Sequence, residues 1–434
     1  MLSTFQTVQK RGMLLFVYTV NPGDSIFTIS QKYDISVDII RGVNGLVNPN
    51  IVPGQALLIN TKIYTVQPGD SLYTISQKAY VSSDMLIAAN PKINPSTIQP
   101  GMKIILPELP NYIATTLGYF YVTGTQSDQL VIRDFAPYTT YYSFFEYHFN
   151  LDGSLSSLND LQAIESAWNS HTAPLATITN LTAAGFSAEL TSQTLNNPAS
   201  RQNFINNIFT LLSQKGYAGV NIDFEGTLAK DRDIFSTFLN ELGSRLHIAG
   251  LLVTIAVPAK TSADIPWYAG YDYGAIGSVV DFMFIMAYDW HHMASEPGAV
   301  APLNEVRKTI EFAVQKMDRS KIVLGIPLYG YNWALPYNSE VLATAISNQD
   351  AIDLAMSKSV PINYSVVDEA PNFYYVDENG QRHVVWFEDT RSIAAKMKLV
   401  REYRLHGIGA WQVGLGFPQG PWLLTKFFRV RKVT

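Results

Sequence analysis

Two carboxylates lie two residues apart in an otherwise apolar run, AGVNIDFEG (218–226). A buried charge is costly unless it is paired or used, so the placement of Asp223 and Glu225 needs an explanation. In a barrel strand alternate side chains point inward, which puts Asn221, Asp223 and Glu225 on one face at intervals of about 6.6 Å. Glu225 comes last, at the C-terminal mouth where barrel active sites lie. The pattern indicates acid–base chemistry rather than a polar layer satisfied by neighbouring hydroxyls.

The shared strand restricts which reaction these acids suit. An ordinary retaining glycosidase places two carboxylates on opposite sides of the scissile bond. Asp223 and Glu225 approach from one side, because they belong to one strand. If Glu225 is the acid, the nucleophile comes from elsewhere, and the 2-acetamido oxygen of the substrate is one known solution.

Short apolar runs alternate with helix-length amphipathic segments over residues 112–434, and this alternation predicts an α/β fold, a (β/α)8 TIM barrel. The runs are 117–122, 140–149, 174–181, 219–225, 251–259, 280–290, 321–330 and 407–414. Between the last two, residues 372–387 read as a hairpin over Asn379-Gly380. We therefore expect a short hairpin insertion around 360–390 and a shallow substrate groove.

The first quarter of the chain contains an internal repeat. YTVNPGDSIFTISQKY (18–33) recurs as YTVQPGDSLYTISQKA (64–79), at an offset of 46 residues. Each unit has a short strand, a Pro-Gly turn, a helix with Asp24 or Ser25 as its N-cap in the first copy, a second helix and a final strand. The repeat predicts two small βααβ modules, at 16–60 and 62–108. The Pro-punctuated linker LPELPNY (106–112) that follows predicts that modules and barrel have separate cores.

The repeated PGDS-x-x-x-IS pattern resembles LysM modules, which bind polymers that contain N-acetylglucosamine, such as peptidoglycan and chitin. The resemblance places a sugar groove between the first strand–helix loop and the segment before the last strand. The implied binding residues are Gly23, Asp24, Ser25 and Ile26 in the first module and Gly69, Asp70, Ser71 and Leu72 in the second. Helix capping is an alternative role for the Asp and Ser side chains. Two weak sites on one chain raise avidity without any new contact.

The barrel region resembles glycoside hydrolase family 18, the chitinase-like barrels. The family's fourth strand ends D-x-D-x-E, and this chain has Asn221 in place of the first acid. The resemblance makes Glu225 the general acid and later the base, and makes Asp223 the group that orients the acetamido group and stabilises the oxazolinium cation. MAYDW (286–290) matches the family's M-x-Y-D, so that Tyr288 would hydrogen-bond the acetamido carbonyl.

The same resemblance implies a set of substrate-binding residues around the reacting sugar. Trp411 in the eighth run would form the floor under that sugar, and GIPLYGYNW (325–333) matches the seventh strand. Trp290 and Trp333 follow their strands and are candidates for stacking on sugars or for packing. The full set of candidates is Asn221, Met286, Asp289, Trp411, Trp290, Trp333 and Tyr119.

Composition excludes several classes of site. A net charge of −5 argues against nucleic acid, which requires clustered Lys and Arg, and the absence of cysteine excludes thiolate chemistry. No apolar run approaches the ~18 residues of a membrane span. Adjacent His291 and His292 lack a third ligand motif, so we expect no metal and no cofactor. Glu146 and His148, near the end of the second run, are interpreted as structural residues.

The leading hypothesis is a retaining N-acetylglucosaminidase that acts on peptidoglycan and is held on its polymer by two LysM modules. A sugar-binding barrel without activity and a chitinase are the alternatives. The arrangement looks like the spore germination hydrolases of Bacillus-type bacteria, which degrade cortex peptidoglycan. This resemblance implies a monomer located in the coat and cortex region of the spore. The apolar run after Lys10-Arg11 has no cleavage site for a signal peptide and is interpreted as the first strand.

Overall fold

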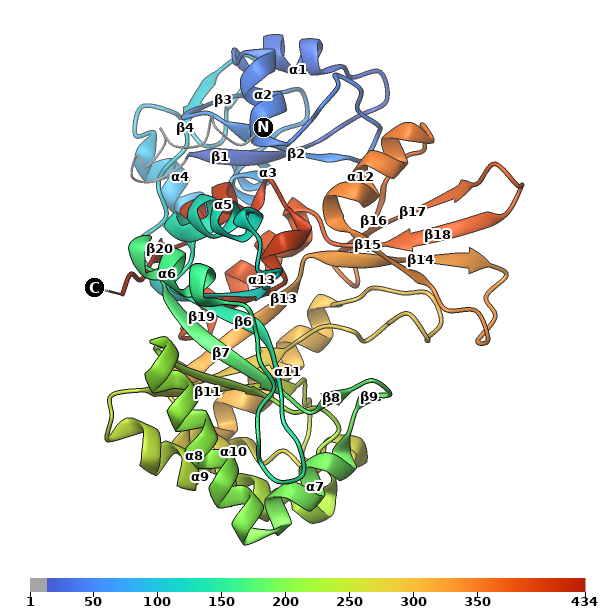
Figure 1. Ribbon diagram of the computed structural model, residues 1–434. Helices are drawn as coiled ribbons and strands as arrows, with labels where there is room; N and C mark the ends of the chain where they lie inside the picture. The colour runs from blue at the N-terminus through green and yellow to red at the C-terminus, as the bar shows by residue number, and fades with distance from the viewer. Residues whose placement is uncertain (1–13, 434) are drawn as a thin grey trace.

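A computed structural model describes residues 14–433 of the chain. Figure 1 shows an N-terminal unit above a barrel, with a smaller sheet projecting to one side of the barrel. The first strand begins at Leu15, as expected for the apolar run, whereas Lys10-Arg11 and the question of a signal peptide lie outside the described residues. Within residues 14–433, no helix is both long enough and apolar enough to cross a membrane.

A closed sheet of parallel strands forms the barrel, because the last strand pairs with the first. Its strands are β5 (Ile113–Tyr121), β6 (Tyr141–His148), β7 (Ala173–Thr179), β10 (Gly219–Asp223), β11 (Leu252–Pro258), β12 (Phe282–Met286), β13 (Ile322–Pro327) and β19 (Gly407–Trp411). The predicted TIM barrel is confirmed. Strand β10 ends at Asp223, so Glu225 lies just beyond the strand rather than within it.

Helices surround the barrel and cover the outward-facing apolar side chains of its strands. They are α5 (Gln126–Phe135), α6 (Leu161–Asn169), α7 (Ala188–Asn196), α8 (Pro198–Lys215), α9 (Arg232–His247), α10 (Tyr273–Val279), α11 (Leu303–Lys316), α13 (Thr390–Glu402) and α14 (Gly420–Phe427). Shorter elements are η2 (Ala136–Tyr138), η3 (Ala229–Asp231), η4 (Pro266–Tyr268), η5 (Arg319–Lys321), η6 (Val413–Leu415), β8 (Leu181–Thr182), β9 (Gly185–Phe186) and β20 (Arg429–Val430).

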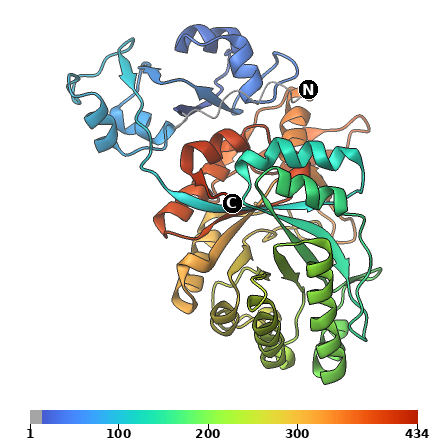
Figure 2. The same cartoon turned by 60° about the vertical axis from the view of Figure 1, so that its left-hand side comes forward.

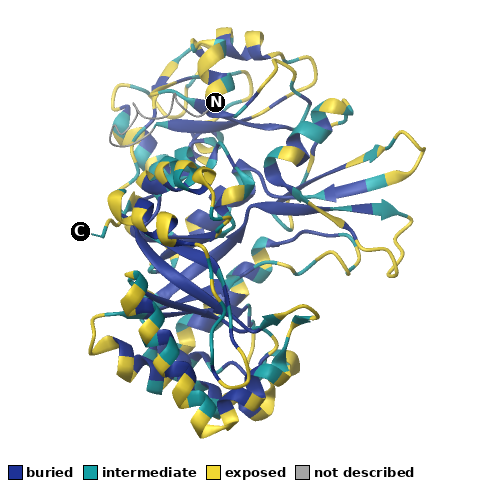
Figure 3. Cartoon of the chain, viewed as in Figure 1, coloured by how far each residue is buried: buried dark blue, intermediate teal, exposed yellow. Residues whose placement is uncertain are grey.

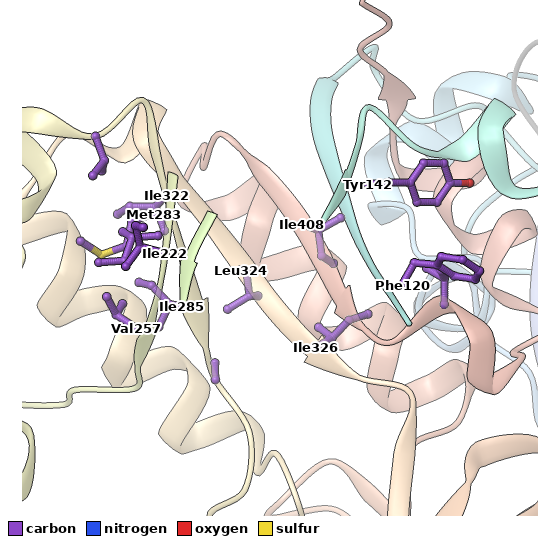
Figure 4. Close-up of a cluster of buried hydrophobic side chains, with 14 of the residues drawn as sticks. Phe120, Tyr142, Ile222, Val257, Met283, Ile285, Ile322, Leu324, Ile326 and Ile408 are labelled. Carbon is purple, nitrogen blue, oxygen red and sulfur yellow. The ribbon is translucent and has the colours of Figure 1, made fainter. Parts of the chain in front are cut away.

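Side chains alternate between two faces along the fourth run (219–225), and this alternation determines which of them pack against the surrounding helices. Phe224 stacks on Phe204 of α8 and on Phe235 and Phe238 of α9, and Ile222 is fully buried in the same cluster. Figure 4 shows Ile222 with other apolar side chains of this layer, and Figure 3 shows the strands buried while the outer helix surfaces are exposed. The opposite parity, residues 221 and 223, is therefore turned toward the barrel interior.

The insertion before the eighth strand is larger than expected. It is an antiparallel sheet in the order β15-β14-β18-β17-β16 with one helix. Its elements are β14 (Tyr329–Leu335), β15 (Thr344–Ser347), α12 (Asn348–Ser357), β16 (Asn363–Ser365), β17 (Ala370–Val376) and β18 (Arg382–Trp386). The hairpin over Asn379-Gly380 exists as β17–β18, but the expectation of a short insertion was wrong. Only Leu328 separates β13 from β14, so the predicted run 321–330 contains both the end of the barrel strand and the start of this sheet.

Both repeats fold as βααβ modules. Their elements are β1 (Leu15–Thr19), α1 (Ile26–Tyr33), α2 (Val37–Val43) and β2 (Ala56–Asn60), then β3 (Ile63–Thr65), α3 (Leu72–Lys78), α4 (Ser83–Ala89) and β4 (Lys103–Ile105). Of the two N-cap candidates in the first module, Ser25 is the cap and forms a capping box with Thr28. The module architecture is as predicted.

The modules share one core with each other, and the first module shares a second core with the barrel. The ring of Phe16 lies 4.9 Å from that of Tyr64 across the two modules. On the other face of the sheet formed by β1 and β2, Val17 and Leu58 are buried in the cluster that contains the barrel's outward side chains. Gln419, just before α14, donates from Nε2 to Oδ1 of Asn44 at 2.6 Å. The expectation of separate cores was therefore wrong, and Figure 2 shows the modules resting on the C-terminal helices.

Candidate active site

Glu225 is positioned by its main chain at the mouth of the barrel. Its N–H donates to Oδ1 of Asn180 at 2.9 Å, and its carbonyl oxygen accepts from Nδ2 of Asn180 at 2.8 Å. Asn180 follows β7 and is fully buried, and its Nδ2 also donates to the carbonyl of Ser187 after the β8–β9 hairpin. The hydroxyl of Tyr271 donates to the carbonyl of Phe224 at 2.6 Å. The main chain that carries the Glu225 side chain is therefore held by hydrogen bonds from both Asn180 and Tyr271.

Asn221 and Tyr119 lie together inside the barrel below the acids. Asn221 donates from Nδ2 to the hydroxyl of Tyr119 at 2.8 Å and accepts on Oδ1 from the hydroxyl of Thr254 at 2.9 Å. Asn221 is fully buried and Tyr119 is 1% exposed. The two side chains support the layer that carries Asp223, and their burial does not favour the direct sugar contact that was predicted for them.

Asp223 is the buried member of the acid pair. It is 3% exposed, and its Oδ1 has no hydrogen-bond partner among the residues that the structure describes. Burial raises its pKa well above the ordinary value, and the charges of Glu225 and Glu146 raise it further. Burial and the charge of Asp289 raise the pKa of Glu225 to about 7. The negative charge of Glu225 therefore disfavours ionisation of Asp223.

Tyr288 and Asp289 follow β12 at the same mouth. Asp289 has a positive φ of 63° and accepts on Oδ1 from the hydroxyls of Tyr329 and Tyr331 at 2.8 and 3.1 Å. These tyrosines belong to β14, so the insertion holds this carboxylate in place. Burial raises the pKa of Tyr288 well above its ordinary value, which keeps the phenol protonated and able to donate a hydrogen bond.

The predicted aromatic residues occupy different environments. Trp411 ends β19, and its half-buried ring lies edge-on to Phe145 at 4.9 Å and near Tyr119 at 5.3 Å. Trp290 is half-buried against the barrel core, while Met286 ends β12 and packs against the same interior cluster as Trp411. Trp333 is 1% exposed, and its indole N–H donates to the carbonyl of Ser295 at 2.8 Å. Stacking on sugar was wrong for Trp333, because β14 buries this ring inside the insertion.

Metal-binding geometry is not found within residues 14–433, where no group of three or more His, Asp or Glu side chains could hold an ion. His291 instead pairs through Nδ1 with the carbonyl of Glu296 at 2.9 Å. The sequence interpretation missed Asn180, Tyr329 and Tyr331 as residues that position the acids. The two tyrosines could have been found in the YGY segment that follows the seventh strand, whereas Asn180 carries no motif.

The LysM loops use their side chains mainly for folding. Asp24 accepts from the hydroxyl of Tyr18 at 2.5 Å, and Asp70 accepts from that of Tyr64 at 2.7 Å. Ser71 caps α3 as Ser25 caps α1. Four further loop residues offer no polar side chain: Ile26 and Leu72 are buried, while Gly23 and Gly69 have φ of 86° and 85° with open space around them. Of these loop residues, Gly23 and Gly69 thus leave their main-chain groups in open surroundings.

Comparison with known families agrees with this geometry. The model of glycosyl hydrolases family 18 matches residues 115–416. The chain belongs to this family. The LysM domain model matches residues 18–60 and 64–107, so the protein is a family 18 glycoside hydrolase with two LysM domains.

Family 18 relatives cover nearly the whole chain. A Bacillus subtilis protein named "Putative sporulation-specific glycosylase YdhD" is 55% identical over 96% of this chain and 100% of its own length. The "Cortical fragment-lytic enzyme" of the same species is 40% identical over 96% of this chain and 99% of its own. The crystal structure of the Bacillus cereus spore cortex-lytic enzyme SleL superposes with a TM-score of 0.89 at 34% identity, and covers 97% of this chain and 100% of that one.

Proposed function

We propose that this family 18 enzyme is a retaining N-acetylglucosaminidase that cleaves spore cortex peptidoglycan or its fragments by substrate-assisted catalysis. The observation that carries the proposal is the buried Asp223 carboxyl, whose Oδ1 lacks a partner within the described chain and lies beside the acid Glu225. An acetamido N–H is one donor that would satisfy such an oxygen. The relatives named for cortex lysis support cortex as the substrate.

The first step forms one bond and breaks another at the anomeric carbon. The carbonyl oxygen of the 2-acetamido group attacks C1 while Glu225 gives its proton to the glycosidic oxygen, so that the leaving sugar departs as an alcohol. Asp223 accepts the acetamido N–H and balances the positive charge of the oxazolinium ring. Tyr288 donates its phenolic hydrogen to the acetamido oxygen and so orients it for attack.

The second step returns the enzyme to its starting state. The Glu225 carboxylate now takes a proton from a water molecule, whose oxygen attacks C1 from the face that the leaving group vacated. The bond between C1 and the acetamido oxygen breaks, and the acetamido group is restored. Two inversions give net retention at C1, and Glu225 ends protonated. A pKa of about 7 for Glu225 suits both the acid and the base role near neutral pH.

The nucleophile decides which bond is cut. Many muramic residues of spore cortex are lactams, which have no acetyl group and a nitrogen tied into a ring. A lactam supplies no attacking oxygen, so next to a lactam residue only N-acetylglucosamine can react in the position over Trp411. Products should therefore carry N-acetylglucosamine at their reducing ends.

Borohydride reduction of digested cortex fragments, followed by mass spectrometry, tests the proposal. We expect reduced N-acetylglucosamine as the main new terminus; reduced muramic acid would refute the assignment. Glu225→Gln is the matched control: it should lose activity by about 10²–10⁴-fold or more while still binding polymer. If the parent and Glu225→Gln proteins bind cortex equally and neither releases product, the barrel only binds sugar. Preferential cleavage of chitin oligomers would indicate a chitinase.

The proposal includes a place of action and an assembly state. We place the enzyme in the coat and cortex region of the spore, supported by the names of its cortex-lytic relatives. We propose a monomer, because one chain carries both acids, the floor residue Trp411 and the clamp on Glu225. Fluorescent fusions imaged during sporulation and light scattering of the purified protein test these two points.

A further inference from the structure

The substitution at Asn221 leaves Asp223 without the acidic neighbour that the family pattern has on this strand. Asn221 is neutral, fully buried and fixed by hydrogen bonds to Tyr119 and Thr254. Within its own strand β10, Asp223 therefore has no charged neighbour below it. The question is whether another strand supplies a charge in its place.

Glu146 lies on strand β6, near its C-terminal end, with a side chain that is 14% exposed. Its Oε2 accepts from the hydroxyl of Thr179 at 2.8 Å, and its Oε1 is 4.0 Å from Nε2 of His148. The strand pairing shifts register between Phe144 and Tyr147, which is the irregularity that carries Glu146. The Glu146 carboxylate is thus partly desolvated, and its hydrogen-bond donor within the described residues is a neutral hydroxyl. In an ordinary structural ion pair the donor would be a charged group at hydrogen-bond distance.

Thr179 connects Glu146 to Asp223. It ends β7, the strand between β6 and β10, and it is the register partner of His148 on one side and of Asp223 on the other. Adjacent strands lie about 4.8 Å apart. Glu146, Thr179 and Asp223 thus occupy one arc of the barrel mouth, and the charge of Glu146 is among the causes that raise the pKa of Asp223.

We infer that Glu146 is a positioning residue of this active site. From the second barrel strand it provides a negative charge that acts on Asp223, a role that the acid at residue 221 has in the family pattern. The inference rests on the proposed substrate-assisted reaction. In the free enzyme the charge of Glu146 raises the pKa of Asp223. In the intermediate the same charge adds to the stabilisation of the oxazolinium cation beside Asp223.

The titratable groups around Asp223 and Glu146 determine how the kcat/KM profile depends on pH. Asp223 is faced by Glu225 of its own segment, by Glu146, and by the phenols of four other residues, which are Tyr119, Tyr121, Tyr271 and Tyr288. Glu146 is faced by His148, Tyr121 and Asp223. The phenols keep their protons well beyond neutral pH, since burial raises their pKa values. Of these three groups that face Glu146, His148 is the one whose protonated form carries a positive charge.

Glu146→Gln tests the inference, because it removes the charge while it keeps the size and the ability to accept from Thr179. Loss of the like charge lowers the pKa of Asp223. The acidic limb of the kcat/KM profile on soluble cortex fragments should therefore move to lower pH, by roughly 0.5–1 unit. The alkaline limb, governed by Glu225 and Asp289, should stay in place. Glu146→Asp should return the acidic limb toward that of the parent.

Thr179→Val provides a second variant that leaves Glu146 intact. It deletes the hydrogen bond that lowers the pKa of Glu146, so Glu146 loses its charge at higher pH, and a smaller shift in the same direction is expected. Acidic limbs that superimpose on the parent in both variants would overturn the inference, whatever happens to kcat. An inactive parent enzyme, or products ending in reduced muramic acid, would instead overturn the proposed function itself.

Discussion

One side chain, that of Asn180, fixes the main chain of Glu225 through two hydrogen bonds of 2.9 and 2.8 Å. Because Glu225 lies two residues beyond the end of β10, the strand ladder does not hold it in place. Asn180 replaces that ladder, with its Oδ1 accepting and its Nδ2 donating. The position of Glu225, the proposed catalytic acid, therefore depends on a residue 45 positions earlier in the chain.

Replacing Asn180 by Ala should affect activity more than stability. The variant loses three hydrogen bonds, two to Glu225 and one to Ser187, each worth about 0.5–1.5 kcal/mol, while a displaced Glu225 should lower kcat by roughly 10–100-fold. Asn196→Ala is the matched control: its Nδ2 donates to Ser192 and Asp231 in the helix layer, and its loss should lower Tm without lowering kcat. Equal kcat values for the two variants would show that the hydrogen bonds to Glu225 do not position the acid.

The alkaline limb of the pH profile should report on Glu225 and Asp289. Glu225 must be protonated to act as the acid, so the rate should fall as pH rises through about 7. The negative charge of Asp289 raises the pKa of Glu225, so Asp289→Asn should move this limb to lower pH. Asp281→Asn, just before the start of β12, is the control and should leave the limb unmoved. An unshifted limb in Asp289→Asn would mean that the two carboxylates are not coupled.

Asn221→Asp restores the acid of the family pattern and should act in the opposite sense to Glu146→Gln. A second carboxylate next to Asp223 raises its pKa by like-charge repulsion, so the acidic limb should move to higher pH. The new side chain keeps an acceptor for the hydroxyl of Thr254 but loses the donor to Tyr119. Measured kcat/KM profiles of the parent and the variant, compared on one soluble substrate, decide the point. An unchanged acidic limb would show that residue 221 and Asp223 are electrically independent.

Local sequence patterns predicted the parts of the fold that depend on them. The period-two pattern of the fourth run identified the inward face of β10, and the PGDS repeat identified both capped modules, because strand parity and capping act over a few residues. The size of the insertion was not predictable in this way, because β14 continues the apolar run of β13. Its boundary becomes visible in the antiparallel pairing of β14 with β15 and β18.

The site was predictable where a family motif spans it and not where distant segments meet. Asp223, Glu225 and Tyr288 lie in motifs. Asn180 contacts Glu225 across 45 residues, and Glu146 reaches Thr179 across 33. Neither spacing has a sequence signal, because both depend on which strands become neighbours in the closed sheet. Trp333 failed for a related reason, since aromatic type alone does not tell an exposed platform from a buried ring.

The last prediction concerns the docked modules. The sequence predicted separate cores for the modules and the barrel, but Leu15, Val17, Ala56 and Leu58 are buried in the same cluster as the barrel's outer side chains. Each fully buried Val or Leu contributes about 1.5–3 kcal/mol. Deletion of residues 1–110 should therefore lower Tm and increase hydrogen exchange in α13 and α14. Activity should fall on soluble fragments as well as on insoluble cortex.

A matched pair of asparagines separates docking from module folding. Asn44 and Asn90 are equivalent in the repeat: each donates from Nδ2 to two carbonyls and accepts a main-chain N–H within its own module. Asn44 alone of the two also accepts from Gln419 of the barrel domain. Asn44→Ala should therefore increase exchange in α14, whereas Asn90→Ala should affect only the modules. Unchanged Tm and soluble activity after deletion of residues 1–110, with no difference between Asn44→Ala and Asn90→Ala in α14, would show that the first module adds nothing to the barrel's stability.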